Sequence, residues 1–210
     1  HQVPDARSWE YADGFVAPSP ALQEAREAAR ADQWEVLSNG TTALLAFLTR
    51  TMQASSVVTI GTDAGVSALA LLEGMSDHGV LTSIDPDAER QAAARKVLSL
   101  ARIRSNQVRL ITGTPLDVLP KLRDGAYDMV LINGDRLEYV EYVSQALRLL
   151  RTGGIVVVND ALANNHVADP DNEDDDTLII RETLDSVLET EEFTPVLLPV
   201  GEGLLLATKS

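Results

Sequence analysis

The sequence predicts an α/β fold: a mostly parallel sheet, doubly wound by helices on both faces, that ends in an antiparallel hairpin. Short β-rich apolar runs alternate with helical stretches between residues 57 and 159. Runs that are apolar on both faces are typical of parallel strands joined by crossover helices. The end of the chain differs, since "PVLLPVGEGLLLATK" (195–209) is typical of two apolar strands around a Gly-Glu-Gly turn.

Two helices are predicted ahead of this alternation, after a polar lead-in. "SPALQEAREAARAD" (19–32) begins with Ser-Pro, a favoured helix start, and continues with strong helix formers. "NGTTALLAFLTRTMQ" (39–53) places Leu44, Leu45 and Leu48 at helical spacing. Both helices therefore have an apolar face to bury.

The remaining elements are predicted from their composition and their place in the alternation. The strands are expected at 57–60, 80–84, 108–111, 128–132 and 155–159. The helices between and after them are expected at 65–75, 87–101, 115–122, 137–150 and 177–189. The acidic run "DPDNEDDD" (169–176) is interpreted as a solvated loop, because it lacks the ligand spacing of a calcium-binding loop.

Composition limits the classes of protein that fit. The 210 residues are enough for one domain spanning 1–210, with a helical lead-in (1–53) and an α/β core (54–210). A net charge of −15 argues against nucleic acid or an anionic membrane as partner. No apolar run is long enough to span a membrane, and the absence of cysteine excludes disulfides and thiolate chemistry. We expect a cytoplasmic protein.

The stretch "SVVTIGTDAGVSALALLEGM" (56–75) predicts a strand that turns at a glycine directly into a helix. Its loop, residues 61–65, departs from the dinucleotide fingerprint because Asp63 stands where a glycine is needed. An anion there would also repel a pyrophosphate, which indicates a nucleoside with little negative charge. Asp85, at the end of the second strand, is placed to accept both hydroxyls of a ribose. Glycine turns followed by an acid also occur in other α/β folds without this role.

The order of several motifs resembles one family. They are "TIGTDAGVSALALL", "LTSIDPD", "VRLITGTPLDVLPKL", "YDMVLINGD", "YVEYVSQALRLLRTGGIVVVND" and "TPVLLPVGEGLLLATK". The chain resembles, from about residue 20 to its end, the class I S-adenosylmethionine (SAM)-dependent methyltransferases. More narrowly, it is similar to the small catechol- and caffeoyl-CoA-type O-methyltransferases of the actinobacterial branch. The run of motifs in this order is more specific than any one of them.

The resemblance implies a Rossmann-like, seven-stranded sheet whose last strand is antiparallel. It also implies a SAM site, with the methionine part of the cofactor held by Gly61, Thr62, Gly65 and Ser67. Asp85 would bind the ribose, and the adenine would be bordered by Gly113, Thr114 and Pro115. Asn133, at the end of the fourth strand, is a further candidate cofactor contact.

The family implied by the resemblance uses a divalent cation, usually magnesium, to hold the acceptor's oxygens and lower the pKa of the attacking hydroxyl. The corresponding positions here are Asn133 and the pair Asn159-Asp160, with Arg136 at the position of a lysine base. This set carries one carboxylate where the family would have two, and an arginine stays protonated. We therefore expect no tightly held magnesium, and activity that survives a chelator.

Few residues remain as candidates for a catalytic base. His166 lies in the loop after the fifth strand, and its ordinary pKa suits proton abstraction. Asp135 follows the fourth strand, and Arg136 could attract an anionic substrate. The alternative for His166 and Asp135 is an ordinary position in a surface loop.

The predicted function is SAM-dependent transfer of a methyl group to a hydroxyl of a small molecule. The alternative is a non-catalytic SAM-binding homologue with an eroded metal site. A nicotinamide dehydrogenase is disfavoured by Asp63 and by the lack of a substrate domain. The two apolar-faced N-terminal helices, together with the resemblance, predict a homodimer.

Overall fold

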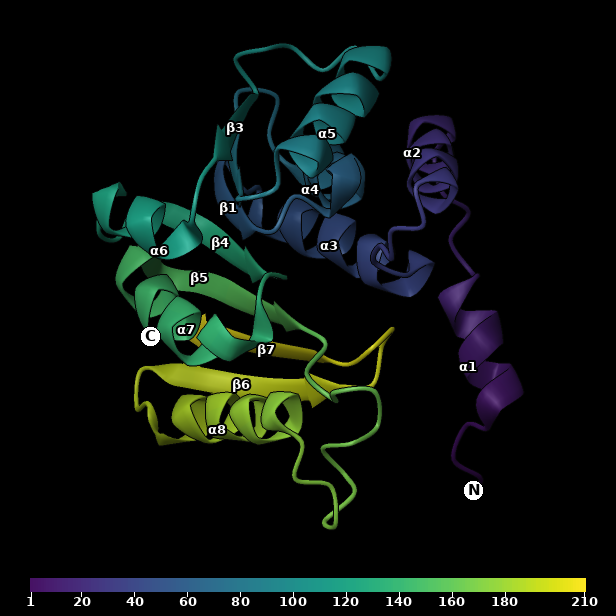
Figure 1. Cartoon of the computed structure of the whole chain (residues 1–210), viewed down its shortest axis with the longest axis vertical. Helices are drawn as coiled ribbons and strands as arrows, with labels where there is room; N and C mark the ends of the chain where they lie inside the picture. Colours follow the sequence, from purple (N-terminus) through teal and green to yellow (C-terminus); the bar gives the residue numbers. More distant parts are fainter.

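The computed structural model describes all residues from His1 to Ser210 and contains one seven-stranded sheet in the order β3-β2-β1-β4-β5-β7-β6 (Figure 1). The first five strands run parallel, and β7 pairs antiparallel with both β5 and β6. The strands are β1 (Ser56–Ile60), β2 (Val80–Asp85), β3 (Val108–Thr112), β4 (Tyr127–Ile132), β5 (Leu150–Asn159), β6 (Phe193–Leu198) and β7 (Leu204–Lys209). The predicted fold class, with its reversed last strand, is confirmed.

Helices cover both faces of this sheet. The helices are α1 (Ala6–Asp13), α2 (Pro20–Ala31), α3 (Asn39–Met52), α4 (Val66–Gly74), α5 (Ala88–Leu100), α6 (Pro115–Val118), α7 (Tyr139–Leu149) and α8 (Asp175–Glu189). Short 3-10 turns span Asp63–Gly65, Leu119–Lys121 and Arg136–Glu138. One apolar core lies between the sheet and the helices α2, α3, α4 and α5. A second lies on the opposite face, between the sheet and α7, α8 and the turn after α6.

The central strands explain why the sheet is buried on both sides. In β1, Val58 and Ile60 enter one core, whereas Val57 enters the other, and none of the three is exposed. Successive side chains of a strand point to opposite faces, so a doubly covered strand has to be apolar throughout. This is the pattern that predicted parallel strands.

The boundaries agree with the sequence in most places. The strands β1 to β4 lie within one residue of the predicted ranges, but β5 begins at Leu150, ahead of the predicted start. The last helix begins at Asp175, so the acidic run 169–176 is a loop only in its first part. Acidic side chains in the first turn of a helix are stabilised by the helix dipole, which explains the earlier start.

The polar lead-in contains a helix that the sequence analysis did not predict. The Asp5 carboxylate accepts a hydrogen bond from the backbone N–H of Ser8 and caps α1. No residue of α1 is buried, and Figure 1 shows this helix beside the rest of the molecule. This helix is short and mostly polar, so it gives little apolar signal in the sequence.

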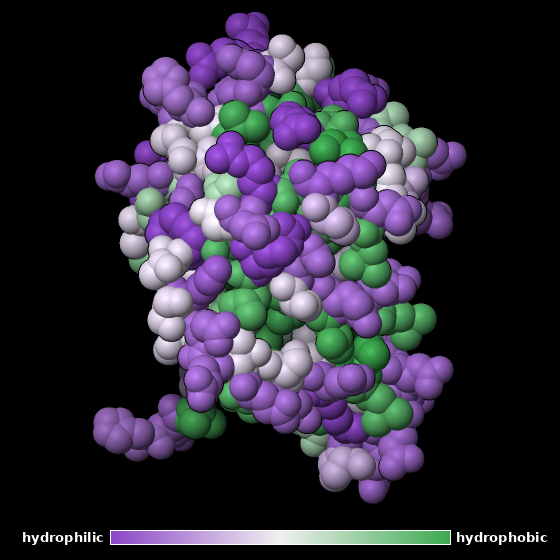
Figure 2. Space-filling model, turned by 90° about the vertical axis from the view of Figure 1, so that its left-hand side faces the viewer, coloured by the Kyte–Doolittle hydropathy of each residue, from purple (hydrophilic) through white to green (hydrophobic).

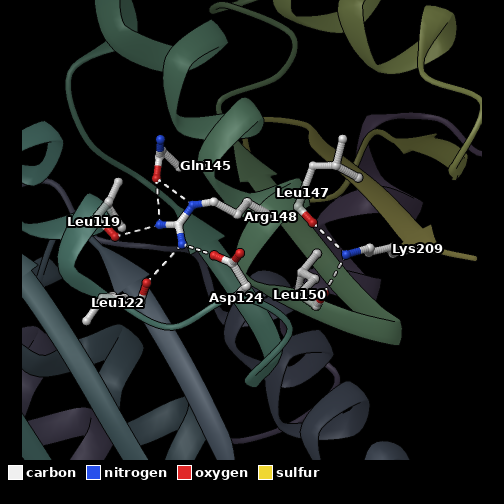
Figure 3. Close-up of polar contacts among 8 residues, drawn as sticks. All are labelled: Leu119, Leu122, Asp124, Gln145, Leu147, Arg148, Leu150 and Lys209. Carbon is white, nitrogen blue, oxygen red and sulfur yellow. Dashed lines mark hydrogen bonds and ion pairs between the residues drawn. The ribbon is translucent and has the colours of Figure 1, made fainter.

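A cluster of hydrogen bonds around Arg148 stabilises the end of the sheet at which the parallel strands begin, called here its amino-terminal edge (Figure 3). The Arg148 guanidinium donates to the carbonyl oxygens of Leu119 and Leu122 and to the side chains of Asp124 and Gln145. Close by, the Lys209 ammonium donates to two further carbonyl oxygens, those of Leu147 and Leu150, each at 2.8 Å. These contacts join α7, β5 and β7 to the turn before β4.

On the face shown in Figure 2, hydrophobic residues form separate patches among hydrophilic ones. None of the helices combines the length and the hydrophobicity that crossing a membrane requires.

Candidate functional site

The loop after β1 has a strained backbone. Gly61 and Gly65 have φ angles of +93° and +90°, and the non-glycine residues Asp63 and Ala64 also have positive φ, at +53° and +51°. A Cβ atom on Gly61 would lie 2.1 Å from the carbonyl oxygen of Asn133. Only glycine therefore allows β1 and β4 to approach at this point, and left-handed non-glycine residues are typical of functional loops.

The Asp63 carboxylate points away from the cleft beside this loop. Its Oδ2 accepts a hydrogen bond of 3.2 Å from the backbone N–H of Leu37, and the side chain is almost fully buried. Burial raises the pKa of Asp63 to about 7, against the opposing influence of the Leu37 hydrogen bond and of Arg26. The expectation that Asp63 would repel an anion in the loop is corrected, because the carboxylate faces the segment between α2 and α3.

A cleft of about 250 Å³ opens at the carboxyl ends of β1, β2 and β4. The predicted cofactor residues that line it are Gly61, Asp85, Pro115 and Asn133. Asp85 is held firmly, since its carboxylate accepts 2.9 Å hydrogen bonds from the backbone N–H groups of Thr62 and Asp87. The carboxylate therefore stands fixed at the wall of the cleft.

The other predicted cofactor residues do not line this cleft. Thr62 and Ser67 are fully buried, and the Ser67 hydroxyl donates a long 3.5 Å bond to the Thr62 carbonyl. Gly65 is also buried, and Val97 of α5 occupies the space that a side chain at this position would need. Gly113 donates its N–H to the carbonyl of Asp85, and Thr114 precedes α6. Their roles as cofactor contacts stay predictions.

Tyr142 of α7 lines the cleft and was missed by the sequence analysis. Its pKa is raised to about 12, first by burial and then by the carboxylates of Glu138, Asp135 and Asp85. The phenol is therefore neutral at neutral pH and can donate a hydrogen bond. The helical spacing of Tyr142 within "YVEYVSQAL" predicts only that it packs in the core.

The three positions that the resemblance assigns to a cation are engaged in hydrogen bonds within the chain. The Asn159 amide donates to Asn133 Oδ1 at 3.0 Å, and Asp160 Oδ2 accepts from Arg136 Nε at 2.9 Å. The Asn159 carbonyl accepts from the hydroxyl of Tyr139, also at 3.0 Å. Two neutral amides and a carboxylate already paired with a guanidinium do not fit a divalent cation, which needs negative oxygen ligands.

Arg136 is held from three sides. Besides the ion pair with Asp160, its Nη1 donates to the Gly134 carbonyl at 2.6 Å, and its guanidinium lies 5.6 Å from the centre of the Tyr139 ring. Burial alone lowers the pKa of Arg136, but Tyr139 and Asp160 raise it above its ordinary value. Arg136 is therefore a permanent cation at this edge of the sheet and not a base.

The two predicted base candidates lie in different loops. Asp135 lines the cleft, and its Oδ1 caps the following turn by accepting from the N–H of Leu137. His166 lies in the loop after β5 with its Nδ1 4.0 Å from Asp174, on the acidic run. No hydrogen bond joins His166 to Arg136 or Asp160. Both catalytic roles stay predictions.

Glu202, in the turn between β6 and β7, is a further charged group that the sequence analysis missed. The backbone of this turn accepts hydrogen bonds from the N–H groups of Ala161 and Leu162, which places it beside Asp160. Burial, followed by the charges of Asp160 and Glu35, raises the pKa of Glu202, and Arg136 opposes this. The Gly-Glu-Gly pattern indicated only a hairpin turn, because nothing local connects it to β5.

Comparison with known proteins agrees with this arrangement. A family model described as O-methyltransferase matches residues 15–210. A Mycobacterium tuberculosis protein that carries the name O-methyltransferase is 37% identical over 201 residues, which cover 96% of this chain and 90% of that protein.

Solved structures give the same result. A Corynebacterium glutamicum protein superposes with a TM-score of 0.91 at 29% identity and 98% coverage of both chains. The O-methyltransferase TomG from Streptomyces achromogenes, solved in complex with SAM, has a TM-score of 0.87 at 26% identity, covering 99% of this chain and all of TomG. The sequence resemblance is confirmed: this chain belongs to the O-methyltransferase family.

Proposed function

We propose that this protein transfers the sulfonium methyl group of SAM to a hydroxyl oxygen of a small molecule. The observation that carries the proposal is the cleft at the carboxyl ends of β1, β2 and β4, in a chain of the O-methyltransferase family. Ligands of open α/β sheets bind at this edge. The alternative of a non-catalytic SAM-binding protein is not favoured, because the relatives compared above carry the name of an enzyme.

Different residues bind the different parts of the cofactor. The fixed carboxylate of Asp85 accepts the ribose hydroxyls, and the loop 61–65 with Ser67 holds the methionine part near the start of α4. Pro115 borders the adenine together with Gly113 and Thr114. The protein would then act mainly by aligning the acceptor oxygen with the methyl carbon and the sulfur.

Calorimetric titration with SAM tests this proposal directly. Wild-type protein is expected to bind SAM and not NAD. Replacing Asp85 with Ala removes hydrogen bonds to a charged acceptor, which is expected to weaken SAM binding by roughly ten- to a hundredfold.

Asp87→Ala is the matched control, because Asp87 is a half-exposed acid that lines the same cleft and caps α5. Its effect on SAM affinity should be several times smaller. Equal SAM affinity of wild type and Asp85→Ala would place the ribose elsewhere.

The proposal includes a cytoplasmic homodimer. Exposed apolar side chains occur on the N-terminal helices, among them Trp9 and Phe47, which are 40% and 66% exposed. Apolar surface of this kind is commonly covered by a second copy of the chain. Sedimentation analysis at micromolar concentration should show a species of twice the chain mass, and a monomer would contradict this part of the proposal.

A further inference from the structure

The guanidinium of Arg136 is only partly used by the protein. Its Nε donates to Asp160 and its Nη1 to the Gly134 carbonyl, whereas Nη2 has no hydrogen bond within the chain. The side chain keeps 27% of its surface exposed. A guanidinium has five donors in a rigid fork, so one edge of the fork remains available to a ligand.

The groups that hold Arg136 connect it to the wall of the cofactor cleft. Asp160, which fixes the guanidinium, directly follows Asn159, and the Asn159 amide donates to Asn133 in the wall of the cofactor cleft. Gly134, whose carbonyl holds Nη1, lines the same cleft. The polar chain therefore runs without a break from the cofactor cleft to Arg136.

We propose that Arg136 takes the place of a divalent cation at this edge of the sheet and binds the methyl acceptor as an oxyanion through Nη2. This inference rests on the proposed function and adds to it a class of substrate. The acceptor is a small molecule whose hydroxyl ionises near neutral pH, such as an acidic phenol or enol.

The charges around Arg136 limit which anionic acceptors the site can bind. Asp160 cancels the unit charge of Arg136, and Glu202 adds negative charge nearby. Negative surroundings oppose any anion in proportion to its charge, so a polyanion is repelled most. A single oxyanion has the least repulsion to overcome and gains charge-assisted hydrogen bonds from the free donors of the guanidinium. The ring of Tyr139 under the guanidinium keeps the fork in place.

The transfer step balances without a metal or a redox partner. The acceptor hydroxyl loses its proton to solvent when it binds as an oxyanion. An oxygen lone pair then forms the bond to the methyl carbon, and the electron pair of the breaking carbon–sulfur bond goes to sulfur. The products are S-adenosylhomocysteine and a methyl ether, which has no charge for Arg136 to hold and is released.

A spectroscopic titration with 4-nitrophenol tests the inference without requiring the natural acceptor. The probe changes its visible absorbance when it ionises, and the protein is kept loaded with S-adenosylhomocysteine. With wild type, the apparent pKa of the bound probe should fall by about one unit, a roughly tenfold preference for the phenolate. The neutral methyl ether 4-nitroanisole should compete weakly for the same site.

Three variants isolate the guanidinium. Arg136→Gln should abolish the shift in the probe's pKa, and Arg136→Lys should keep a smaller shift because it retains the charge without the fork. Arg123→Gln makes the same change in net charge at an exposed side chain without hydrogen-bond partners, and it should behave as wild type. Thermal melting of each variant shows whether it is folded.

The outcomes distinguish a failure of the role of Arg136 from a failure of the proposed SAM-dependent function. Calorimetry with S-adenosylhomocysteine should give equal affinities for wild type and Arg136→Gln. If wild type does not bind the cofactor, the proposed function fails. If it binds the cofactor but the probe's pKa is unshifted, or is shifted equally in Arg136→Gln, the role of Arg136 is overturned while the proposed function stands.

Discussion

Two arginines, Arg136 just before α7 and Arg148 in its last turn, lie at opposite ends of the parallel strands and have different contacts. Arg148, at the amino-terminal edge, donates to two carbonyl oxygens and two side chains (Figure 3). Arg136, at the carboxyl edge, makes two hydrogen bonds and leaves Nη2 without a partner. A guanidinium whose donors are all engaged holds structure together, whereas one with a free edge can bind a ligand.

The backbone shows the same contrast between the two edges. At the carboxyl edge, a Cβ atom added to Gly61 would clash with the backbone of Asn133. The nearby residues Asp63 and Ala64 have left-handed backbone conformations. Gly125, ahead of β4 at the amino edge, also has a positive φ, +60°, but nothing lies within 4 Å of an added Cβ. Gly61 is therefore required by both its backbone conformation and a close approach, whereas Gly125 is required by its backbone conformation alone.

The largest effect is expected from Arg148→Met, which leaves the carbonyl oxygens of Leu119 and Leu122 without their donor. We expect the free energy of unfolding to fall by about 3 to 5 kcal/mol, because partly buried polar groups lose a charged partner. Urea denaturation measures it. Arg136→Met should cost clearly less, and equal losses for the two variants would remove the distinction between a structural and a ligand-binding arginine.

The next effect concerns the two glycines. Gly61→Ala should destabilise the protein by about 2 to 4 kcal/mol, because the methyl group meets the backbone of Asn133 at a left-handed position. Gly125→Ala has only the left-handed backbone to overcome and should cost about 1 kcal/mol. Urea denaturation of both variants gives the difference, and similar losses would show that φ alone, and not the close approach, requires Gly61.

The buried Asp63 predicts a dependence of stability on pH. Its folded pKa of about 7 lies above its ordinary value of 3.8, so the folded protein binds the proton more tightly than the unfolded chain. Stability from this group is therefore highest below the ordinary pKa, declines as the pH rises through the window up to about 7, and stays low above it.

Asp63→Asn removes this titration. At a pH well above 7 it should be more stable than wild type by on the order of 2 kcal/mol, and this advantage should shrink as the pH falls. Urea denaturation across the pH range gives both curves. Parallel curves for wild type and variant would show that Asp63 titrates at its ordinary pKa.

The smallest effect is expected from magnesium. Calorimetry should detect no tight magnesium binding by the wild-type protein, and SAM affinity should be unchanged by a chelator, because Arg136 already neutralises Asp160. A variant with Asn133→Asp, Asn159→Asp, Asp160→Asn and Arg136→Met restores two carboxylates without the competing cation and should bind magnesium. Sub-millimolar magnesium binding by wild type would contradict the electrostatic argument.

The amino-acid sequence alone was sufficient to predict the order of strands and helices, the terminal hairpin, the glycine loop and the acid at the end of β2. These features depend on local periodicity and on backbone conformations that only certain residues adopt, so neighbouring letters are enough to reveal them. The family could be predicted for the same reason, since its motifs are short and ordered. The helix α1 was missed because it is short and mostly polar and packs no residue into the core.

The tertiary structure decided which polar groups meet. The pairing of Arg136 with Asp160, the position of Glu202 beside β5 and the turn of Asp63 toward Leu37 join residues that are far apart in the sequence. Such contacts depend on the approach of separate loops at the edge of the sheet, which no local pattern encodes. The fold therefore follows from local preferences and burial, whereas the chemistry of the site follows from which charges the packed loops bring together.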